Sequence, residues 1–143
     1  MFIGEFNHSI DEKGRLSVPA KFREELAKGL VLTRGLDGCL WLYPAEKWQG
    51  IVESVAKLPV TQKNARSFSR FILSGAMDLK LDRAGRVLIP KYLSEYASIK
   101  SKVVIIGIND KLELWADQSW GKFKKEMEEN SEEVAENLAE LGI

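Results

Sequence analysis

The chain has 143 residues, of which 45% are hydrophobic and 29% charged, and its formal net charge is zero. This composition is typical of a globular domain with a real core and excludes a disordered chain. No apolar run approaches the roughly 18 residues of a membrane span, and residues 1–10 show no secretory signal. The single cysteine, Cys39, cannot form an internal disulfide. We therefore expect a cytoplasmic protein.

The zero net charge hides an uneven distribution. Residues 57–91 contain eight Lys and Arg against two Asp, whereas the chain from Glu126 onward contains seven Glu and no base. A basic stretch can meet phosphates while an acidic tail keeps the net charge low. Two solvated helix faces of opposite sign would give the same pattern, so charge alone leaves both interpretations open.

A ten-residue motif occurs twice. Ile-Asp-Glu-Lys-Gly-Arg-Leu-Ser-Val-Pro at residues 10–19 aligns with Leu-Asp-Arg-Ala-Gly-Arg-Val-Leu-Ile-Pro at residues 81–90, an offset of 71, and Trp48 aligns with Trp120 at an offset of 72. Two units are too few for a solenoid. We predict two halves, residues 1–75 and 76–143, that pack on each other about a pseudo-twofold axis and form one compact core.

Both halves begin with the same predicted elements. A first strand leads into the Asp-x-x-Gly turn, and a second leaves it with alternate apolar side chains on one face. Pro19 and Pro90 then end the strand and begin a short helix. A hairpin follows, formed by residues 30–33 and 39–42 in the first half and by residues 103–106 and 112–115 in the second.

Each half ends in helix. Apolar residues recur at helical spacing over residues 48–55, and Thr61 can cap another helix that ends before Gly75. The same spacing recurs over residues 120–141. A four-stranded half cannot bury both faces of its sheet alone. We therefore predict an α+β fold in which both repeats form one β-barrel with helices around it.

Residues suited to catalysis or metal binding are scarce. His8 and Cys39 are the only histidine and cysteine, and neither a metal-ligand spacing nor a Gly-rich phosphate loop occurs. We predict that His8 is a half-exposed strand residue and Cys39 a small buried side chain. The sequence thus predicts no catalytic residue, metal or cofactor. An enzyme whose active site has no recognisable sequence motif is the least favoured hypothesis.

The repeated motif can hold an arginine in place. Its glycine allows a left-handed backbone in a tight turn, and its aspartate can accept backbone N–H groups and restrain the arginine four residues later. A restrained guanidinium suits phosphate oxygens and the guanine edge in the major groove. The residues expected to shape the two turns are therefore Asp11, Gly14, Asp82 and Gly85. The candidate DNA-binding residues are Lys13, Arg15, Arg83 and Arg86.

For a single copy, an Asp–Arg pair that only stabilises a hairpin would be the favoured explanation. Two copies about a pseudo-twofold axis favour recognition, because duplex DNA offers approximate repeats to a twofold binder. The loop tips differ, with Glu12-Lys13 in the first copy and Arg83-Ala84 in the second. The two copies therefore need not contribute equally.

These residues carry a resemblance to a known family. Each motif resembles the AbrB-type swapped-hairpin DNA-binding element, and two copies in a chain of this length closely resemble the MraZ family. Met-Phe-Ile-Gly-Glu at the start and Thr-Arg-Gly-Leu-Asp-Gly-Cys-Leu at residues 33–40 extend the match. The resemblance implies an AbrB-like swapped-hairpin β-barrel. It also ranks Lys13 and Arg15 ahead of the second copy.

The resemblance further implies a nucleoid-associated transcriptional regulator. It implies binding to short direct repeats in the promoter of the division and cell-wall gene cluster, including the chain's own gene. The implied partners are double-stranded promoter DNA and further copies in an octamer-like homo-oligomeric ring, with no membrane and no small-molecule substrate. The alternative is an AbrB-like protein-interaction or scaffold module without specific DNA binding, since such folds also serve as dimerisation parts of antitoxins.

Overall fold

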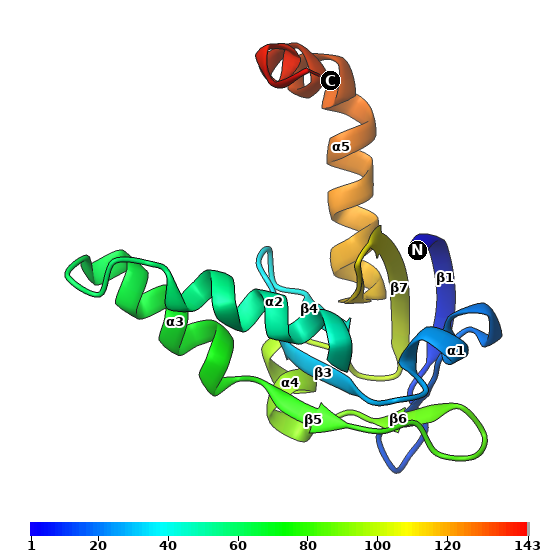
Figure 1. Cartoon of the computed structure of the whole chain (residues 1–143). Coiled ribbons are helices and arrows are strands. Elements are labelled where there is room, and N and C mark those ends of the chain that lie inside the picture. The colour runs from blue at the N-terminus through cyan, green and yellow to red at the C-terminus, as the bar shows by residue number, and fades with distance from the viewer. Residues whose placement is uncertain (143) are drawn as a thin grey trace.

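The structure is a computed structural model that describes residues 1–142 (Figure 1). The first half contains β1 (Phe2–Ser9), β2 (Arg15–Ser17), η1 (Ala20–Phe22), α1 (Arg23–Leu26), β3 (Leu30–Arg34), β4 (Leu40–Pro44), α2 (Ala45–Ala56) and α3 (Lys63–Ser74). The second half contains β5 (Met77–Leu79), β6 (Arg86–Leu88), α4 (Lys91–Tyr96), β7 (Lys102–Asn109), β8 (Lys111–Ala116), α5 (Asp117–Asn137) and η2 (Ala139–Leu141).

Strands of the two halves interleave. An antiparallel six-stranded sheet has the order β1-β7-β8-β4-β3-β5, and β2 pairs with β6 in a separate two-stranded ribbon. The first half supplies β1 to the β7 edge, and the second half supplies β5 to the β3 edge. Neither half could form these sheets without strands from the other.

The pairing has approximate twofold symmetry. In the ribbon, Leu16 faces Val87, its own counterpart at the offset of 71. In the centre of the large sheet, Trp41 faces Glu113, its counterpart at the offset of 72. An antiparallel pair in which a residue faces its own counterpart has a twofold axis through that pair. The axis therefore passes through the ribbon and through the β4–β8 pair.

The α+β class is confirmed, but the predicted barrel is not closed. Over residues 1–142, β1 and β5 lie at opposite ends of the large sheet, and the ribbon stands apart as a sheet of its own. Strand β5 has three residues, and both Met77 and Asp78 are exposed. A closed barrel would require β5 to pair with β1, and so short a strand does not form that pairing.

The main core combines both halves. It contains Leu16 and Val87 from the ribbon, Phe22 and Leu26 from the first short helices, and side chains from one face of the large sheet, including Leu42. All of these are at most 1% exposed. The ribbon and the short helices are therefore fixed against the sheet by their apolar faces.

The opposite face of the sheet carries a smaller apolar cluster. Buried Cys39 and Trp115 belong to it, and Trp120 packs against it. Helix α5 is attached there, because the rings of Trp120 and Phe123 lie 5.4 Å and 5.3 Å from that of Trp115. After Phe123, α5 leads away from the sheet (Figure 1), and no residue of this helix is buried. Within residues 1–142, none of its helices has the length and apolar character needed to cross a membrane.

Helices α2 and α3 form an arm that extends from the sheet (Figure 1). The predicted cap at Thr61 is wrong, because α3 begins at Lys63 after Gln62, and no side chain caps it. The preceding residues form a turn in which the Gln62 N–H donates to the Pro59 carbonyl. Thr61 lies inside this turn and therefore precedes the helix by too many residues to cap it. The predicted position of Gly75 just past the helix is confirmed.

Candidate nucleic-acid interface

The first motif forms a closed loop around Asp11. Its Oδ1 accepts the backbone N–H groups of Lys13 and Arg15, both at 2.9 Å, and its Oδ2 accepts Nε–H of Arg15 at 2.7 Å. The Gly14 N–H donates to the Asp11 carbonyl at 3.0 Å, and Gly14 has a φ of +82°. Asp11 thus organises the turn and restrains the arginine at the same time.

The second motif repeats this geometry around Asp82. Its Oδ1 accepts the N–H groups of Ala84 and Arg86, and its Oδ2 accepts Nε–H of Arg86, all at 2.9 Å. Gly85 has a φ of +77°. The predicted turn geometry is therefore confirmed in both copies.

Both aspartates are held in their charged form. The backbone N–H of Arg15 and then its guanidinium lower the pKa of Asp11, and Arg86 lowers the pKa of Asp82 in the same order of causes. A lowered pKa means that the carboxylate contributes its stabilisation above the unfolded-chain value of about 3.9 and loses it as the pH falls through the lower folded value. Both arginines therefore remain restrained throughout the neutral range.

The substitution Asp11→Asn tests this restraint. The amide oxygen can still accept the two backbone N–H groups, but the amide nitrogen cannot accept Nε–H of Arg15. We expect an intact turn, a mobile arginine and a several-fold weaker affinity for DNA, because ordering one such side chain costs about 0.5–1.5 kcal/mol. Amide NMR shifts would report the turn and a DNA titration the affinity. Unchanged DNA affinity with Arg15 shown to be mobile would contradict the prediction.

The ribbon places both arginines on one surface. Arg15 pairs with Leu88, and Arg86 pairs with Ser17. Cross-strand partners and alternate residues share a face, so these four side chains lie on the face opposite to buried Leu16. Arg15 and Arg86 are diagonal neighbours, a spacing of roughly 7–8 Å. The structure therefore brings together the two arginines that are 71 positions apart in sequence.

The arginine side chains are about one-third exposed, at 31% for Arg15 and 33% for Arg86. The other two candidates, Lys13 and Arg83, lie exposed in the loops. Neither forms an ion pair among the described residues. All four candidates therefore have donor groups that a ligand can reach.

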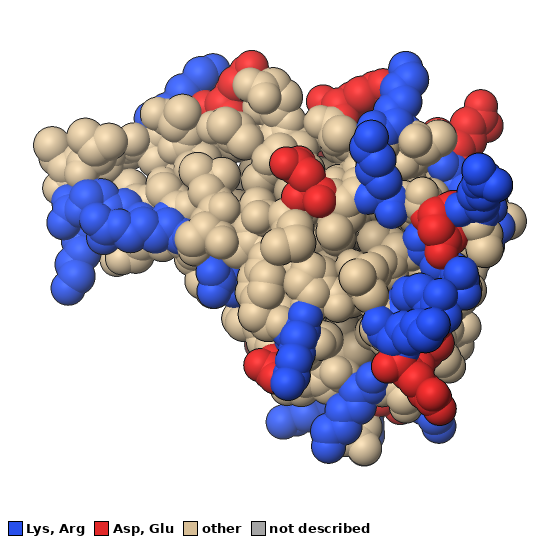
Figure 2. Space-filling view, turned by 90° about the horizontal axis from the view of Figure 1, so that it is seen from below, with Lys and Arg blue, Asp and Glu red and all other residues tan. Residues whose placement is uncertain are grey.

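Basic side chains gather on the side of the molecule that carries these loops. Both loops lie at the lower side in Figure 1, whereas α5 leaves from the upper side. Seen from below, many Lys and Arg side chains lie on the right of the surface, with some Asp and Glu among them, and others lie near the end of the α2–α3 arm at the left (Figure 2). The acidic helix and the basic surface thus face different directions, which suits a polyanionic ligand below.

Sequence reasoning missed Arg23, which lies against the second loop. Its Nε donates to the Val18 carbonyl at 2.9 Å. A Cβ added at Gly85 would overlap this guanidinium, whereas one at Gly14 meets nothing closer than 3.5 Å. Aligning the halves could have given a signal, since the counterpart of Arg23 at the offset of 71 is Ser94.

The two glycines should therefore respond differently to alanine. Both substitutions force a left-handed alanine, at a cost of about 1–2 kcal/mol of folding free energy. We expect Gly85→Ala to lower the free energy of unfolding by about 1 kcal/mol more than Gly14→Ala does, because Arg23 must also give up its hydrogen bond. Urea unfolding of the two variants would measure this. Equal losses would contradict the packing of Arg23 against Gly85.

His8 and Cys39 lie in the surroundings predicted for them. His8 is a half-buried residue of β1, and Cys39 is fully buried. Burial raises the pKa of the Cys39 thiol, so it is not a reactive thiolate. Across the described residues, no group of three or more His, Cys, Asp and Glu side chains could hold a metal ion.

The fold and the site define an internally duplicated α+β protein that presents two restrained arginines on a basic surface. The family model of the MraZ protein, described as antitoxin-like, matches residues 1–71 and 72–141. The chain is 48% identical over 143 residues to the transcriptional regulator MraZ of Syntrophomonas wolfei, with 100% of both chains covered. The same regulators of Clostridium acetobutylicum and Halothermothrix orenii are 47% identical with equal coverage.

The chain belongs to the MraZ family, as its motifs predicted. These relatives are named as transcriptional regulators and not as enzymes, in agreement with the prediction that the chain is not an enzyme.

Proposed function

We propose that the protein is a sequence-specific DNA-binding transcriptional regulator. The observation that carries this proposal is the pair of restrained arginines on the outer face of one ribbon, Arg15 and Arg86. The major groove admits a two-stranded β-ribbon, and an arginine there can donate to guanine O6 and N7. Lys13 and Arg83 at the loop tips would meet the phosphates on either side.

The proposed target is a set of short direct repeats in the promoter of the division and cell-wall gene cluster, including the chain's own gene. The family resemblance supports this target and a nucleoid location. One ribbon makes few contacts, so a single chain would bind weakly and lose affinity steeply with salt. Several chains joined in an octamer-like ring would engage successive repeats and gain through effective concentration.

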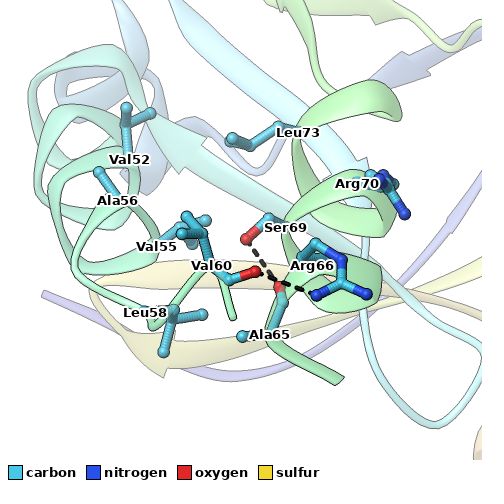
Figure 3. Close-up of a pocket in the computed structure, with 10 residues that line it drawn as sticks. All are labelled: Val52, Val55, Ala56, Leu58, Val60, Ala65, Arg66, Ser69, Arg70 and Leu73. Carbon is cyan, nitrogen blue, oxygen red and sulfur yellow. Dashed lines mark hydrogen bonds between the residues drawn. The ribbon is translucent and has the colours of Figure 1, made fainter. Parts of the chain in front are cut away.

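The α2–α3 arm offers a surface for assembly of such a ring. A groove of about 310 Å³ runs between the two helices, with apolar side chains including Val52, Val55, Leu58 and Leu73 along its walls (Figure 3). Arg70 is at its rim and lies on the side of α3 that is turned away from α2 (Figure 3). An accessible apolar groove of this kind is suited to a protein partner.

We propose that the acidic part of α5 from a neighbouring copy occupies this groove. From Glu126 onward the chain contains seven Glu, no base, and exposed Leu138 and Leu141. This combination of apolar and acidic side chains complements an apolar groove with an arginine rim. Figure 1 shows α5 directed away from the arm of its own chain, so the match is between copies.

Charge reversal at the groove rim tests the assembly. We expect Arg70→Glu to dissociate the oligomer at low salt, because it sets like charges against each other across the contact. The exposed Lys47 on α2 gives a matched control, and Lys47→Glu should leave the mass unchanged. Light scattering after size exclusion would measure the masses. An oligomer that survives Arg70→Glu unchanged would place the contact elsewhere.

Gel retardation tests the proposed function itself. The protein is titrated onto the DNA upstream of its own gene in the presence of a scrambled duplex as competitor. Retention of the upstream complex at excess competitor supports sequence-specific binding. A protein-interaction module is the second candidate, favoured by the antitoxin-like description of the family. A stoichiometric protein partner in a pull-down, with no retardation at low salt, would establish that candidate instead.

A further inference from the structure

The two loops have the same motif but different surroundings. Beside the first loop lies an open groove of about 480 Å³, here called the Lys91 groove; it is lined by residues 10–14, residues 88–91, Ser94 and Lys100. Beside the second loop, the Arg23 side chain packs against Gly85 and donates to the Val18 carbonyl.

The internal alignment explains this difference. At the offset of 71, Gly85 corresponds to Gly14, Val18 to Ile89 and Arg23 to Ser94. The small Ser94 therefore leaves open beside the first loop the space that Arg23 fills beside the second. The Ser94 hydroxyl donates to the Lys91 carbonyl of its own helix at 3.0 Å and does not reach across the groove.

The Lys91 groove is also chemically distinct. Lys13, Lys91 and Lys100 line it and are all exposed, whereas the counterparts of Lys13 and Lys91 at the offset of 71, Ala84 and Ala20, are uncharged. The chain thus places three ammonium groups around an open groove beside the first loop, and two of them have no charged counterpart beside the second. Ammonium groups on flexible stems are suited to phosphate oxygens.

Acidic groups near the groove reduce this charge without cancelling it. Asp11 also lines the groove, but its carboxylate is already occupied by Arg15 and two backbone N–H groups. Glu12 lies at the same loop, and Glu95 is 3.7 Å from Lys91 in an exposed ion pair. Such exposed pairs exchange readily for a stronger anionic ligand.

We propose that the Lys91 groove seats a phosphate of the DNA backbone beside the ribbon face that carries Arg15, and that only the first loop has such a seat. This inference rests on the proposed function. Phosphate contacts fix the register of a protein on the duplex, while base contacts read the sequence. The first copy is thereby anchored on the duplex, and the two copies of the motif acquire unequal roles.

The test compares two double variants that remove the same charge. Lys91→Gln with Lys100→Gln empties the groove of two ammonium groups. Lys122→Gln with Lys125→Gln removes two from α5, which leaves the opposite side of the molecule (Figure 1). Retardation of the upstream DNA and of a scrambled duplex is measured across a salt series, and circular dichroism checks the fold.

We expect the groove variant to bind both duplexes about tenfold more weakly at moderate salt and to lower the salt slope by about one per lysine in contact. The ratio of upstream to scrambled affinity should stay unchanged, because phosphate contacts carry no sequence information. The α5 variant should match the wild type. Filling the groove by Ser94→Met should also weaken binding, although it removes no charge.

Three results would overturn the inference. The first is equal affinity and slope for the groove and α5 variants. The second is wild-type affinity for Ser94→Met. The third is stabilisation of the wild type by inorganic phosphate that the groove variant loses while its DNA affinity is unchanged, which would assign the groove to a free phosphorylated ligand. A wild type that retards no duplex at any salt would instead refute the proposed function.

Discussion

Replacing Arg15 by alanine is expected to abolish specific retardation of the upstream DNA. A bidentate contact of arginine with guanine contributes about 1–3 kcal/mol of discrimination, and an oligomer would lose one such contact in every engaged subunit. The fold and the assembly should survive, because the Arg15–Asp11 pair is exposed and the Asp11 carboxylate keeps its two backbone N–H donors.

Arg86→Ala is the comparison variant, because it removes the counterpart arginine on the same ribbon face. Affinity for scrambled DNA should change little in either variant. The lost affinity for the upstream DNA therefore appears as a lower ratio of specific to nonspecific binding. Circular dichroism and light scattering would verify fold and mass. An Arg15→Ala protein that binds the upstream DNA as tightly as the wild type at matched salt would refute the role of Arg15.

A large loss of stability is expected from a substitution at Gly107, where β7 pairs with β1. Gly107 pairs with Gly4 in β1, and a Cβ at position 107 would lie 2.6 Å from the Cα of Ile3 and from the carbonyl carbon of Phe2. Both atoms belong to backbone, so no side-chain rotation relieves the overlap. We expect Gly107→Ala to lose about 2–3 kcal/mol of unfolding free energy as β1 is pushed from β7.

Gly50→Ala provides the opposite control. Gly50 lies inside α2 with nothing within 4 Å of an added Cβ. Alanine there should raise the unfolding free energy by about 0.5–1 kcal/mol through helix propensity and reduced freedom of the unfolded chain. Urea unfolding would measure both variants. A Gly107→Ala protein as stable as the wild type would show that the two strands are not held so closely.

Features that depend on neighbours in sequence could be predicted. The contacts that Asp11 makes with Lys13 and Arg15 span at most four residues, so residue types and spacing were sufficient to derive them. The first hairpin is also a local feature, and Asp37 and Gly38 between its two strands both adopt a positive φ.

Features that depend on distant pairing could not be predicted. The diagonal placement of Arg15 and Arg86 follows from the register of β2 on β6, which no local pattern determines. The barrel was wrong because closure depends on the length of β5, and only three residues pair there. The residues of the second loop do not indicate that Arg23 fills the space beside Gly85, because Arg23 is 62 positions away in sequence and meets this loop only in the folded chain.

The most direct test of the account is retardation of the DNA upstream of the chain's own gene as its repeats are removed one at a time at fixed salt. If restrained arginines on several joined chains read successive repeats, affinity should fall steeply with each repeat lost and approach that of scrambled DNA when one remains. Affinity that is independent of repeat number, or equal to that for scrambled DNA from the start, would contradict sequence-specific binding by an assembly of these chains.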